Sequence, residues 1–378
     1  MAEVFSVGGL GERLENIGRL AQKLGFVRVC APDAGLSASS GEELGILFLS
    51  FRPEAPKIIM VISGAHGVEG PAGYDLQLNL LENRVHEKLP PDVGLVLLVA
   101  LNPWGWVNGR RTDENNVDLN RNGWLSAPPD LRPFDPEINA LVHPESCDEK
   151  WYRELIGWLT DPERCRSLRV QVFRGQYDNP QGIFYGGQER VWSLGKLEDC
   201  CASLAKTCRH LAVLDIHTGL GEWGEITLTS SAGPGSDDRA LVTRIRSWFG
   251  LGPVFPNLGQ TDTINAVSSD FLSFVAQRLP AAQVIPLAVE IGTVPFEEGF
   301  PVFVAENFCY HHHQVVSGQV FLGADSGSGW YFSRDLQPML QEIFYPSVID
   351  GTKGPWSSAI RAGFGPIFRT VVRGLAEV

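Results

Sequence analysis

The chain has 378 residues, of which 44% are hydrophobic, 20% charged and 10% aromatic, so it can form one large globular domain or two ordinary ones. Its net charge of −13 argues against nucleic acid as the main partner, because binding phosphates requires clustered lysine and arginine. No run reaches the ~18 apolar residues of a membrane span, and the amino-terminal residues lack the pattern of a signal peptide. We therefore expect a cytoplasmic protein that binds no membrane and keeps its seven cysteines reduced.

In chain order, apolar residues at helical spacing predict a docking helix over residues 8–25. Residues 46–51 and the continuous apolar run 58–62 (IIMVI) predict two strands, the second of them buried on both faces. A helix predicted over residues 71–87 leads to another apolar run at 94–101 (GLVLLVAL). Strand, helix and strand in this order predict a right-handed crossover and an α/β sheet.

A histidine and a carboxylate follow the run 58–62, after the small residues 63–65 that suit a sharp exit from a strand. His66 and Glu69 thus stand where open α/β sheets place their ligands. Imidazole nitrogen and carboxylate oxygen are ligand types of catalytic zinc, which keeps three protein ligands and leaves one position for water.

A polar stretch at residues 110–122 (RRTDENNVDLNRN) follows the run 94–101. It can be a solvated loop or a substrate loop at the end of a strand. The second interpretation rests on side chains that can hold a carboxylate or a carbonyl oxygen, because arginine pairs with carboxylates through two hydrogen bonds. These side chains are Arg110, Arg111, Asn116, Asn120 and Arg121.

The middle of the chain carries fewer indications of chemistry. Residues 124–144 are rich in proline and indicate an irregular insertion, and residues 151–159 predict a helix. Residues 177–187 (YDNPQGIFYGG) form a turn-rich segment whose two tyrosines can line a pocket or merely pack, and packing is the favoured interpretation on this pattern alone.

Two more apolar runs end in residues with chemistry. Residues 210–217 (HLAVLDIH) end in His217, and residues 282–291 carry the lone carboxylate Glu290, which is costly to bury unless it is paired or functional. The remaining predicted elements are a strand at 225–229 and helices at 240–249, 269–279, 336–344 and after 356.

Other clusters are weaker candidates. The spacing of Cys200, Cys201 and Cys208 disfavours a structural metal site. Three consecutive histidines follow Cys309, but consecutive side chains point in different directions, so residues 311–313 are interpreted as a partly exposed loop feature.

Five motifs in order resemble the zinc metallocarboxypeptidases. The motifs are HxxE at His66 and Glu69, NPxG at Asn102, NNVDLNR ending at Asn120 and Arg121, DIHTG at His217, and VEIGT at Glu290. This superfamily includes carboxypeptidase A and deacylases of the succinylglutamate desuccinylase and aspartoacylase type. Further detail, including GIFYGG at 182–187, resembles a branch of zinc carboxypeptidases classed as a domain of unknown function.

The resemblance covers at least residues 46–293 and implies a fold. We expect residues 1–378 to form a single catalytic domain of the α/β class, with three α/β/α layers around a central mixed, mostly parallel sheet. We also expect a Pro-rich insertion near 124–180 and a helical tail from about residue 330.

The resemblance further implies a role for each matching residue. His66, Glu69 and His217 would bind one zinc ion, and Glu290 would be the general base that activates water and later gives its proton to the leaving amine. A positioned general base contributes roughly 100- to 10,000-fold in rate.

Four residues of the 110–122 stretch would serve the substrate and the metal ligands. Arg111 would polarise the scissile carbonyl and stabilise the oxyanion, with Arg110 as the alternative. Asn120 and Arg121 would grip the terminal carboxylate of the substrate, and Asp118 would orient His66.

One departure from the family concerns a tyrosine. Digestive carboxypeptidases have an active-site tyrosine between the second histidine and the catalytic glutamate, whereas this chain has none between Tyr185 and Tyr310. Either another residue closes the pocket or Tyr185 approaches from the earlier loop and contacts the substrate.

Three functions follow from these motifs. The first is hydrolysis of a C-terminal peptide or amide bond next to a free carboxylate, and the second is deacylation of an N-acyl amino acid. A non-catalytic module that binds a carboxylate-bearing ligand is the third, and it is disfavoured because every expected catalytic position is filled.

Overall fold

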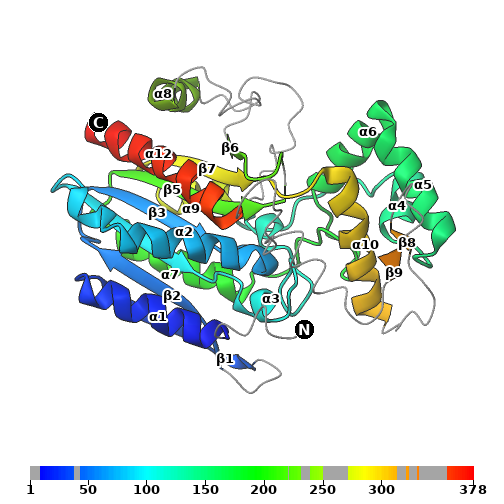
Figure 1. The fold of residues 1–378 in the computed structure, drawn as a ribbon, viewed down its shortest axis with the longest axis horizontal. Helices are drawn as coiled ribbons and strands as arrows, with labels where there is room; N and C mark the ends of the chain where they lie inside the picture. Colours follow the sequence, from blue (N-terminus) through cyan, green and yellow to red (C-terminus); the bar gives the residue numbers. More distant parts are fainter. Residues whose placement is uncertain are drawn as a thin grey trace.

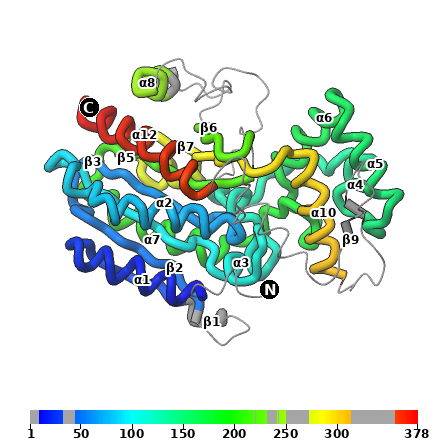
Figure 2. Tube along the Cα trace, in the orientation of Figure 1, coloured from blue at the N-terminus to red at the C-terminus, as the bar shows by residue number. Residues whose placement is uncertain are grey.

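The computed structural model describes residues 9–37, 43–219, 221–230, 239–249, 271–312, 321–322, 330–331 and 356–378. These residues form a β-sheet with helices on both faces, and a further group of helices lies beyond one end of the sheet (Figure 1). Near the carboxyl terminus, α12 (Trp356–Ala376) runs beside α2 (Gly70–Glu82) (Figure 2). The α/β/α arrangement that the sequence predicts is therefore confirmed.

The main sheet has seven strands in the order β1-β2-β4-β3-β5-β7-β6. The adjacent strands β4, β3, β5 and β7 run parallel, whereas β1, β2 and β6 pair antiparallel with their neighbours, which gives the expected mixed sheet. Its strands are β1 (Val27–Ser37), β2 (Glu43–Phe51), β3 (Lys57–Ser63), β4 (Val93–Val99), β5 (His210–Thr218), β6 (Ile226–Thr229) and β7 (Gln283–Ile291). A separate antiparallel pair consists of β8 (Phe321–Leu322) and β9 (Trp330–Tyr331).

The edge strand β1 is an element that the apolar pattern does not predict. Val27 and Val29 are 56% and 55% exposed, and within the seven-stranded sheet β1 pairs only with β2. Pro32 lies within β1, and proline is tolerated in a sheet on edge strands because it cannot donate a ladder hydrogen bond. An edge strand therefore lacks the continuous apolar run that marks the central strands.

The apolar run of β3 is explained by burial on both faces of the sheet. Ile58, Met60 and Ile62 belong to one apolar core, and Ile59 and Val61 belong to another on the opposite face. All five side chains are fully buried. Successive strand residues point to opposite faces, so a strand covered on both sides must be apolar at every position.

The two cores are closed by helices on either side of the sheet. On one side lie α1 (Leu10–Lys23), α2, α8 (Arg239–Phe249) and α12, and on the other lie α7 (Trp192–Leu204) and α9 (Phe271–Arg278). Short elements complete this part: α3 (Pro103–Val107) and the 3₁₀ turns η1 (Gly67–Glu69), η2 (Val85–Lys88) and η3 (Leu119–Arg121). The helix predicted over 71–87 ends at Glu82, because Arg84 adopts a left-handed backbone with φ of 49°.

A group of four helices packs around an apolar core of its own: α4 (Pro136–Val142), α5 (Glu149–Thr160), α6 (Pro162–Phe173) and α10 (Phe296–His312). Pro136 and Pro162 stand in the first turns of α4 and α6. Proline is well suited there, since the first N–H groups of a helix have no intrahelical partner. These prolines start helices, so the prediction of an irregular segment over residues 124–144 is wrong where α4 forms.

The spacing of apolar residues does not predict helix α10, because its middle lacks the polar stripe of an amphipathic helix. Residues 300–308 are all buried, including Glu306 and Asn307, so the middle of the helix has no exposed polar face. His311 and His312 lie in its last turn, so the interpretation of the three histidines as a loop feature is wrong for these two. His313 lies outside the described residues.

The carboxyl-terminal part contains one long helix, α12, which continues through Pro366. The helix predicted over residues 336–344 lies outside the described residues. Among the helices that the structure describes, none is long and apolar enough to cross a membrane. All seven cysteines are described, and none of them forms a disulfide, in agreement with the prediction.

Candidate active site

The candidate site lies at the carboxyl ends of three adjacent parallel strands, β3, β5 and β7. His217 stands near the end of β5, and Glu290 is its register partner near the end of β7. His66 and Glu69 follow β3, and Glu69 ends the 3₁₀ turn η1. The structure thus brings together four residues that the sequence places after separate apolar runs.

The turn after β3 is packed tightly against the loop that carries Arg110 and Arg111. The backbone N–H of Val68 donates to the carbonyl of Arg110 at 2.9 Å, and that of Gly67 donates to the carbonyl of Arg111 at 3.3 Å. A Cβ atom at Gly67 would lie 2.1 Å from the carbonyl carbon of Gly105, so only glycine fits there. This contact fixes the position of the turn that carries Glu69 relative to the arginine loop.

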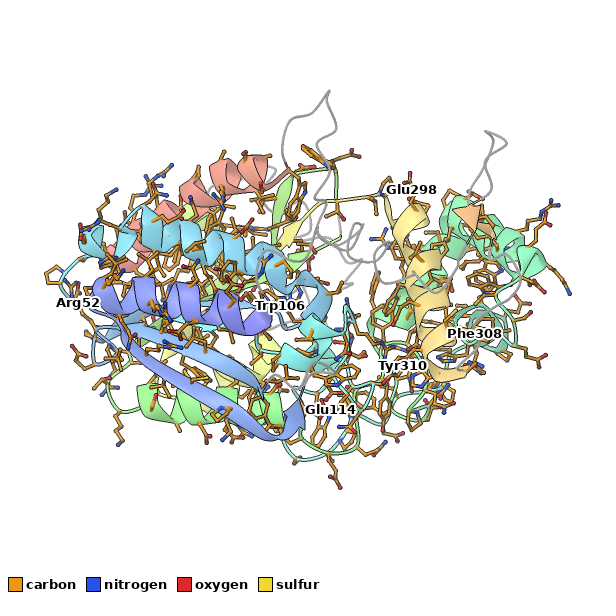
Figure 3. All side chains as sticks on the ribbon, turned by 60° about the horizontal axis from the view of Figure 1, so that its bottom comes forward. Arg52, Trp106, Glu114, Glu298, Phe308 and Tyr310 are labelled. Carbon is orange, nitrogen blue, oxygen red and sulfur yellow. The ribbon has the colours of Figure 1, made fainter. Side chains whose placement is uncertain are left out.

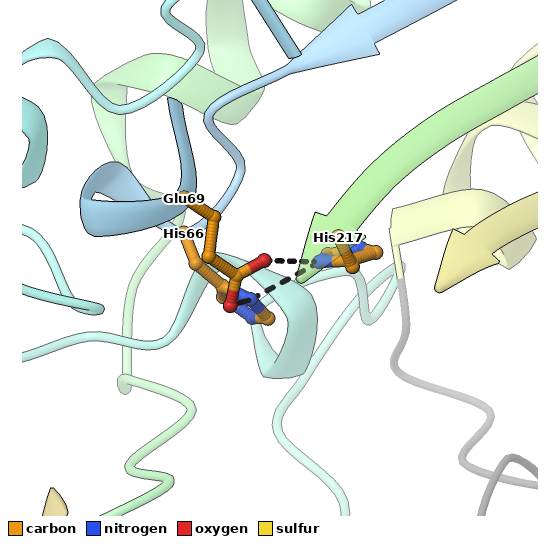
Figure 4. Close-up of side chains that lie close together, drawn as sticks. All are labelled: His66, Glu69 and His217. Atoms are coloured by element: carbon orange, nitrogen blue, oxygen red, sulfur yellow. Dashed lines mark hydrogen bonds and ion pairs between the residues drawn. The ribbon is translucent and has the colours of Figure 1, made fainter. Parts of the chain in front are cut away.

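Three side chains converge at this point (Figure 4). Nδ1 of His66 lies 2.8 Å from Oε1 of Glu69, Nδ1 of His217 lies 3.1 Å from Oε2 of Glu69, and the two Nδ1 atoms lie 3.1 Å apart. All three side chains are buried. The atoms of these three residues that could bind a metal ion all lie within 4.8 Å of one another. Among the described residues, this is the group of histidine, cysteine or acidic side chains that could hold a metal ion.

Each histidine ring has a second carboxylate at its far nitrogen. Nε2 of His66 lies 3.3 Å from Oδ1 of Asp118, and Nε2 of His217 contacts Oδ2 of Asp215. Both carboxylates are fully buried. A carboxylate at one ring nitrogen fixes the orientation of the ring and leaves the other nitrogen to bind a metal.

The charged groups of the cluster shift the pKa values of one another toward the ionised forms. Burial by itself raises the pKa of Glu69, but His66 and His217 outweigh burial and hold that pKa well below its ordinary value. The backbone N–H of Thr218 also donates to Oε2 of Glu69 at 3.0 Å. For His217, burial lowers the pKa, but Asp215 and Glu69 together raise it well above its ordinary value. Glu69 is therefore an ionised carboxylate, as a metal ligand must be.

Arg111 lies next to the cluster, whereas Arg110 does not. Nε of Arg111 donates to Oδ2 of Asp118 at 2.9 Å, and its NH1 lies 3.7 Å from Oε1 of Glu69. Burial raises the pKa of Asp118, but Arg111 and the neighbouring histidine hold it well below its ordinary value. Arg110 is instead buried in an ion pair with Glu306 of α10 at 2.7 Å, which makes it unsuited to be the alternative to Arg111.

Asn120 and Arg121 lie on the 3₁₀ turn η3, which Asp118 begins. Oδ1 of Asp118 accepts a hydrogen bond from the backbone N–H of Asn120 at 2.9 Å, so the residue that faces His66 also caps this turn. Asn120 is half-buried and Arg121 is buried. The guanidinium of Arg121 lies 5.6 Å from the ring centre of Phe184, and the hydroxyl of Tyr177 donates to the carbonyl of Arg121 at 2.6 Å.

Glu290 is half-buried beside the cluster. Burial raises its pKa, His217 lowers it and Glu69 raises it, with a net increase above the ordinary value. A raised pKa brings a carboxylate closer to the working pH of a general base.

Tyr185 reaches the site through its backbone. Its carbonyl accepts a hydrogen bond from the N–H of Asp118 at 2.7 Å, and the residue pairs with Gln176 in an isolated β-bridge. The side chain is buried, and burial raises the pKa of its phenol. The GIFYGG segment is therefore part of the frame around Asp118.

Two residues of this site are missing from the roles predicted from the sequence, Asp215 and Phe184. Asp215 stands two residues before His217 on a strand, and this spacing, which puts both side chains on one face, is the pattern that can reveal it. Phe184 lies in a turn-rich segment, and no local pattern links it to the arginines that it contacts.

The cysteine cluster holds no metal site among the described residues. Cys201 and Cys208 lie in the core beneath α7, with Cys200 packed against it. Burial raises the pKa of the Cys200 thiol to about 12 and that of Cys208 to about 11, so these thiols stay protonated.

Residues 35–325 match the family described as Protein of unknown function (DUF2817). The chain belongs to this family. The sequence motifs resemble a branch of zinc carboxypeptidases classed as a domain of unknown function, and the match confirms this resemblance. All the metal-ligand candidates, and Glu290 as well, lie inside the matched range of the DUF2817 family.

One curated relative of this DUF2817 chain is Carboxypeptidase SOL1 of Arabidopsis thaliana, 30% identical over 133 residues. That alignment covers 32% of this chain and 25% of the relative, so the chain spans about a quarter of the curated protein that it matches.

Similar solved structures have low sequence identity. Carboxypeptidase A from Helicoverpa armigera is 14% identical, with a TM-score of 0.43, over 94% of this chain and 74% of that one. A metallo-carboxypeptidase from Pseudomonas aeruginosa, in complex with (2-guanidinoethylmercapto)succinic acid, is 15% identical, with a TM-score of 0.38, over 96% and 69%. Succinylglutamate desuccinylase from Chromobacterium violaceum is 14% identical, with a TM-score of 0.35, over 73% and 68%.

Proposed function

We propose that the protein is a zinc-dependent hydrolase that cleaves a C-terminal peptide or amide bond next to a free carboxylate, as metallocarboxypeptidases do. The observation that carries the proposal is the convergence of His66, Glu69 and His217, whose possible ligand atoms lie within 4.8 Å of one another. Glu290 lies beside this cluster, and Arg111 lies next to it from another loop. A metal centre with a carboxylate base and a cation nearby is the equipment of metal-assisted amide hydrolysis.

The donor set fits a zinc ion. Two imidazole nitrogens and one carboxylate are the protein ligands of many catalytic zinc sites, which leave a further position open. His66 and His217 would bind through Nδ1, because their Nε2 atoms already face Asp118 and Asp215. When bound in such a site, zinc acts as a Lewis acid that polarises a carbonyl oxygen and makes water more acidic.

Glu290 would carry the proton between the two stages of the reaction. Its carboxylate accepts a proton from the attacking water and then donates it to the nitrogen of the leaving amine. The burial-raised pKa of Glu290 favours both transfers, since a base whose pKa lies nearer the working pH can accept and release a proton readily.

The residues of the arginine loop would bind the rest of the substrate. Arg111 would stabilise the negative charge that develops on the scissile carbonyl oxygen. Asn120 and Arg121, on the next turn of the same loop, would hold the free carboxylate, for which the guanidinium fork is well suited. We assign Tyr185 to the segment that binds the substrate, since its backbone carbonyl accepts a hydrogen bond from the N–H of Asp118.

The alternative within the same chemistry is deacylation of an N-acyl amino acid. Both substrates present a free carboxylate next to the amide, so both use the same anchor and the same base. We also propose that residues 1–378 form a single catalytic domain and that the protein is cytoplasmic.

A substrate panel tests the proposal and separates these two activities. The zinc-loaded protein is assayed with short peptides, the same peptides amidated at the carboxyl terminus, and N-acyl amino acids. We expect hydrolysis of peptides with a free terminus, little hydrolysis of the amidated forms, and loss of hydrolysis after chelation with recovery on adding zinc.

Three results would count against the proposal. A purified protein without zinc that gains no activity when zinc is added rules out the metal-dependent reaction. Equal rates on free and amidated peptides remove Asn120 and Arg121 as the carboxylate anchor. Turnover of N-acyl amino acids alone replaces the peptidase with the deacylase.

A further inference from the structure

Phe184 has a backbone conformation that bulky residues rarely adopt. Its φ is +53°, in the left-handed region where a side chain normally clashes with its own backbone. The side chain is buried. Strained conformations of this kind persist only where the surrounding structure enforces them, and they gather at functional sites. The strained backbone directs the ring of Phe184 toward two arginine side chains.

The ring of Phe184 contacts two guanidinium groups. The central guanidinium carbon of Arg111 lies 4.9 Å from the ring centre, and that of Arg121 lies 5.6 Å from it. Both distances are within the range of a cation–π attraction. These two groups, here called the guanidinium pair, are the cations assigned above to the oxyanion and to the substrate carboxylate.

The ring is fixed in place by two other aromatic side chains. Phe173 of α6 and Phe303 of α10 lie 5.6 and 5.3 Å from Phe184 between ring centres, with interplanar angles of 77° and 65°. Such edge contacts are a favoured geometry of aromatic pairs. Because α6 and α10 share one apolar core, the ring belongs to a packed layer rather than to a mobile loop.

The backbone on either side of the ring is also held. The carbonyl of Phe184 accepts from the N–H of Gln176 at 3.1 Å, and the carbonyl of Tyr185 accepts from the N–H of Asp118 at 2.7 Å. The left-handed turn at Phe184 lets its ring meet the guanidinium pair while the next carbonyl holds Asp118.

We propose that Phe184 is a positioning residue that holds the guanidinium pair together as one anion-binding surface. The proposal rests on the proposed function, since that function assigns both arginines to the substrate. Two like charges repel each other, and a carboxylate between them would compete with an anionic substrate for the same N–H donors. An aromatic face attracts both cations through its quadrupole and carries no net charge, so it adds no second carboxylate to Asp118, which already accepts a hydrogen bond from Nε of Arg111.

The test measures binding rather than turnover. Binding of 3-phenylpropanoic acid, which has no N-acyl bond to hydrolyse, and of its uncharged amide to the full-length protein is measured by calorimetry for the wild type, Phe184→Leu and Phe184→Tyr. We expect the wild type to prefer the acid, Phe184→Leu to lose about tenfold of that preference through weaker binding of the acid, and Phe184→Tyr to retain it. Affinity for the amide should be the same in all three proteins.

A matched control separates positioning from general damage to the core. Phe308 lies in the same apolar core and is equally buried, but it stacks on His312 rather than on the arginines. Phe308→Leu should lower the thermal unfolding temperature as Phe184→Leu does and yet keep the preference for the acid. Thermal unfolding also verifies that each variant is folded.

Several outcomes would overturn the proposal: an unchanged acid preference in Phe184→Leu, an equal loss for acid and amide, a loss in Phe184→Tyr, or no acid preference in the wild type. None of these depends on turnover, so they are distinct from failure of the proposed function. A protein that hydrolyses peptides but shows one of the first three outcomes keeps its proposed activity and loses only the role of Phe184. A wild type without acid preference loses the proposed carboxylate anchor as well.

Discussion

Glu290 lies beside His217 because the two residues are register partners on the adjacent parallel strands β7 and β5. Register partners point to the same face of a sheet, so the strand pairing itself puts the proposed base next to the metal-ligand candidate. A slip of one residue would turn Glu290 to the opposite face. The position of the proposed base relative to His217 therefore depends on sheet register rather than on a loop.

Replacing Glu290 by glutamine removes the base and keeps the shape of the side chain. We expect Glu290→Gln to bind zinc like the wild type, because Glu290 is not among the three converging ligand residues. Peptide hydrolysis should fall by roughly 100- to 10,000-fold, the usual contribution of a general base. Zinc content by elemental analysis and initial rates measure the two effects, and unchanged activity would remove Glu290 from the mechanism.

Asp215 should contribute to metal affinity although it does not face the metal position. Asp215→Asn weakens the contact to Nε2 of His217, so we expect zinc affinity to fall by about 10- to 100-fold. Competition with a chelating dye measures this change. Asp199→Asn is the control, since Asp199 is exposed and pairs with Lys196 at 2.9 Å. A loss of affinity there as large as in Asp215→Asn would contradict the assignment.

Asp113 should make stability depend on pH. Burial, with a smaller contribution from Glu114, raises its pKa from 3.8 to about 7. Between these values the folded protein holds more protons than the unfolded chain, so the free energy of unfolding should fall as pH rises from about 4 to about 7. The loss is at most about 4 kcal/mol, since each pKa unit corresponds to about 1.4 kcal/mol.

Asp113→Asn is the variant that checks this dependence. The amide oxygen can still accept from the N–H groups of Asn115 and Val117, and the side chain no longer titrates. Urea unfolding near pH 4 and near pH 8 should show a smaller decrease for Asp113→Asn than for the wild type. Parallel pH profiles for the two proteins would show that Asp113 titrates normally.

The ion pair between Arg110 and Glu306 should stabilise the attachment of α10. Both side chains are buried. The guanidinium carbon of Arg110 lies 3.6 Å from the ring centre of Tyr310, which is labelled in Figure 3. Removing one partner of a buried pair leaves the other charge unpaired, so we expect Glu306→Gln to cost about 3–5 kcal/mol in unfolding free energy. Denaturant unfolding measures this value.

The control for this pair is on the same helix. Glu298 lies in the first turn of α10 and is exposed, so Glu298→Gln should cost less than about 1 kcal/mol through the helix dipole alone. Equal costs for Glu306→Gln and Glu298→Gln would show that the buried pair contributes nothing specific.

The sequence by itself determined where the proposed chemistry stands in the chain. His66 and Glu69, His217, and Glu290 each accompany a continuous apolar run, and such runs are typical of parallel strands covered on both faces. Because the carboxyl ends of adjacent parallel strands meet at one edge, these residues were predictable as one site from local patterns. Edge strand β1 and helix α10 were not predictable in this way, because neither carries the pattern of its class.

Only the tertiary structure decided which side chains surround that site. Arg110 and Arg111 are neighbours in the chain, yet one is buried against Glu306, 196 residues away, and the other lies beside Glu69. Phe184, whose backbone is strained, contacts two arginines through its ring. The position of this ring depends on how α6 and α10 pack against it. Long-range contacts of this kind leave no periodic pattern in the sequence, because they are set by packing between segments that lie far apart in the chain.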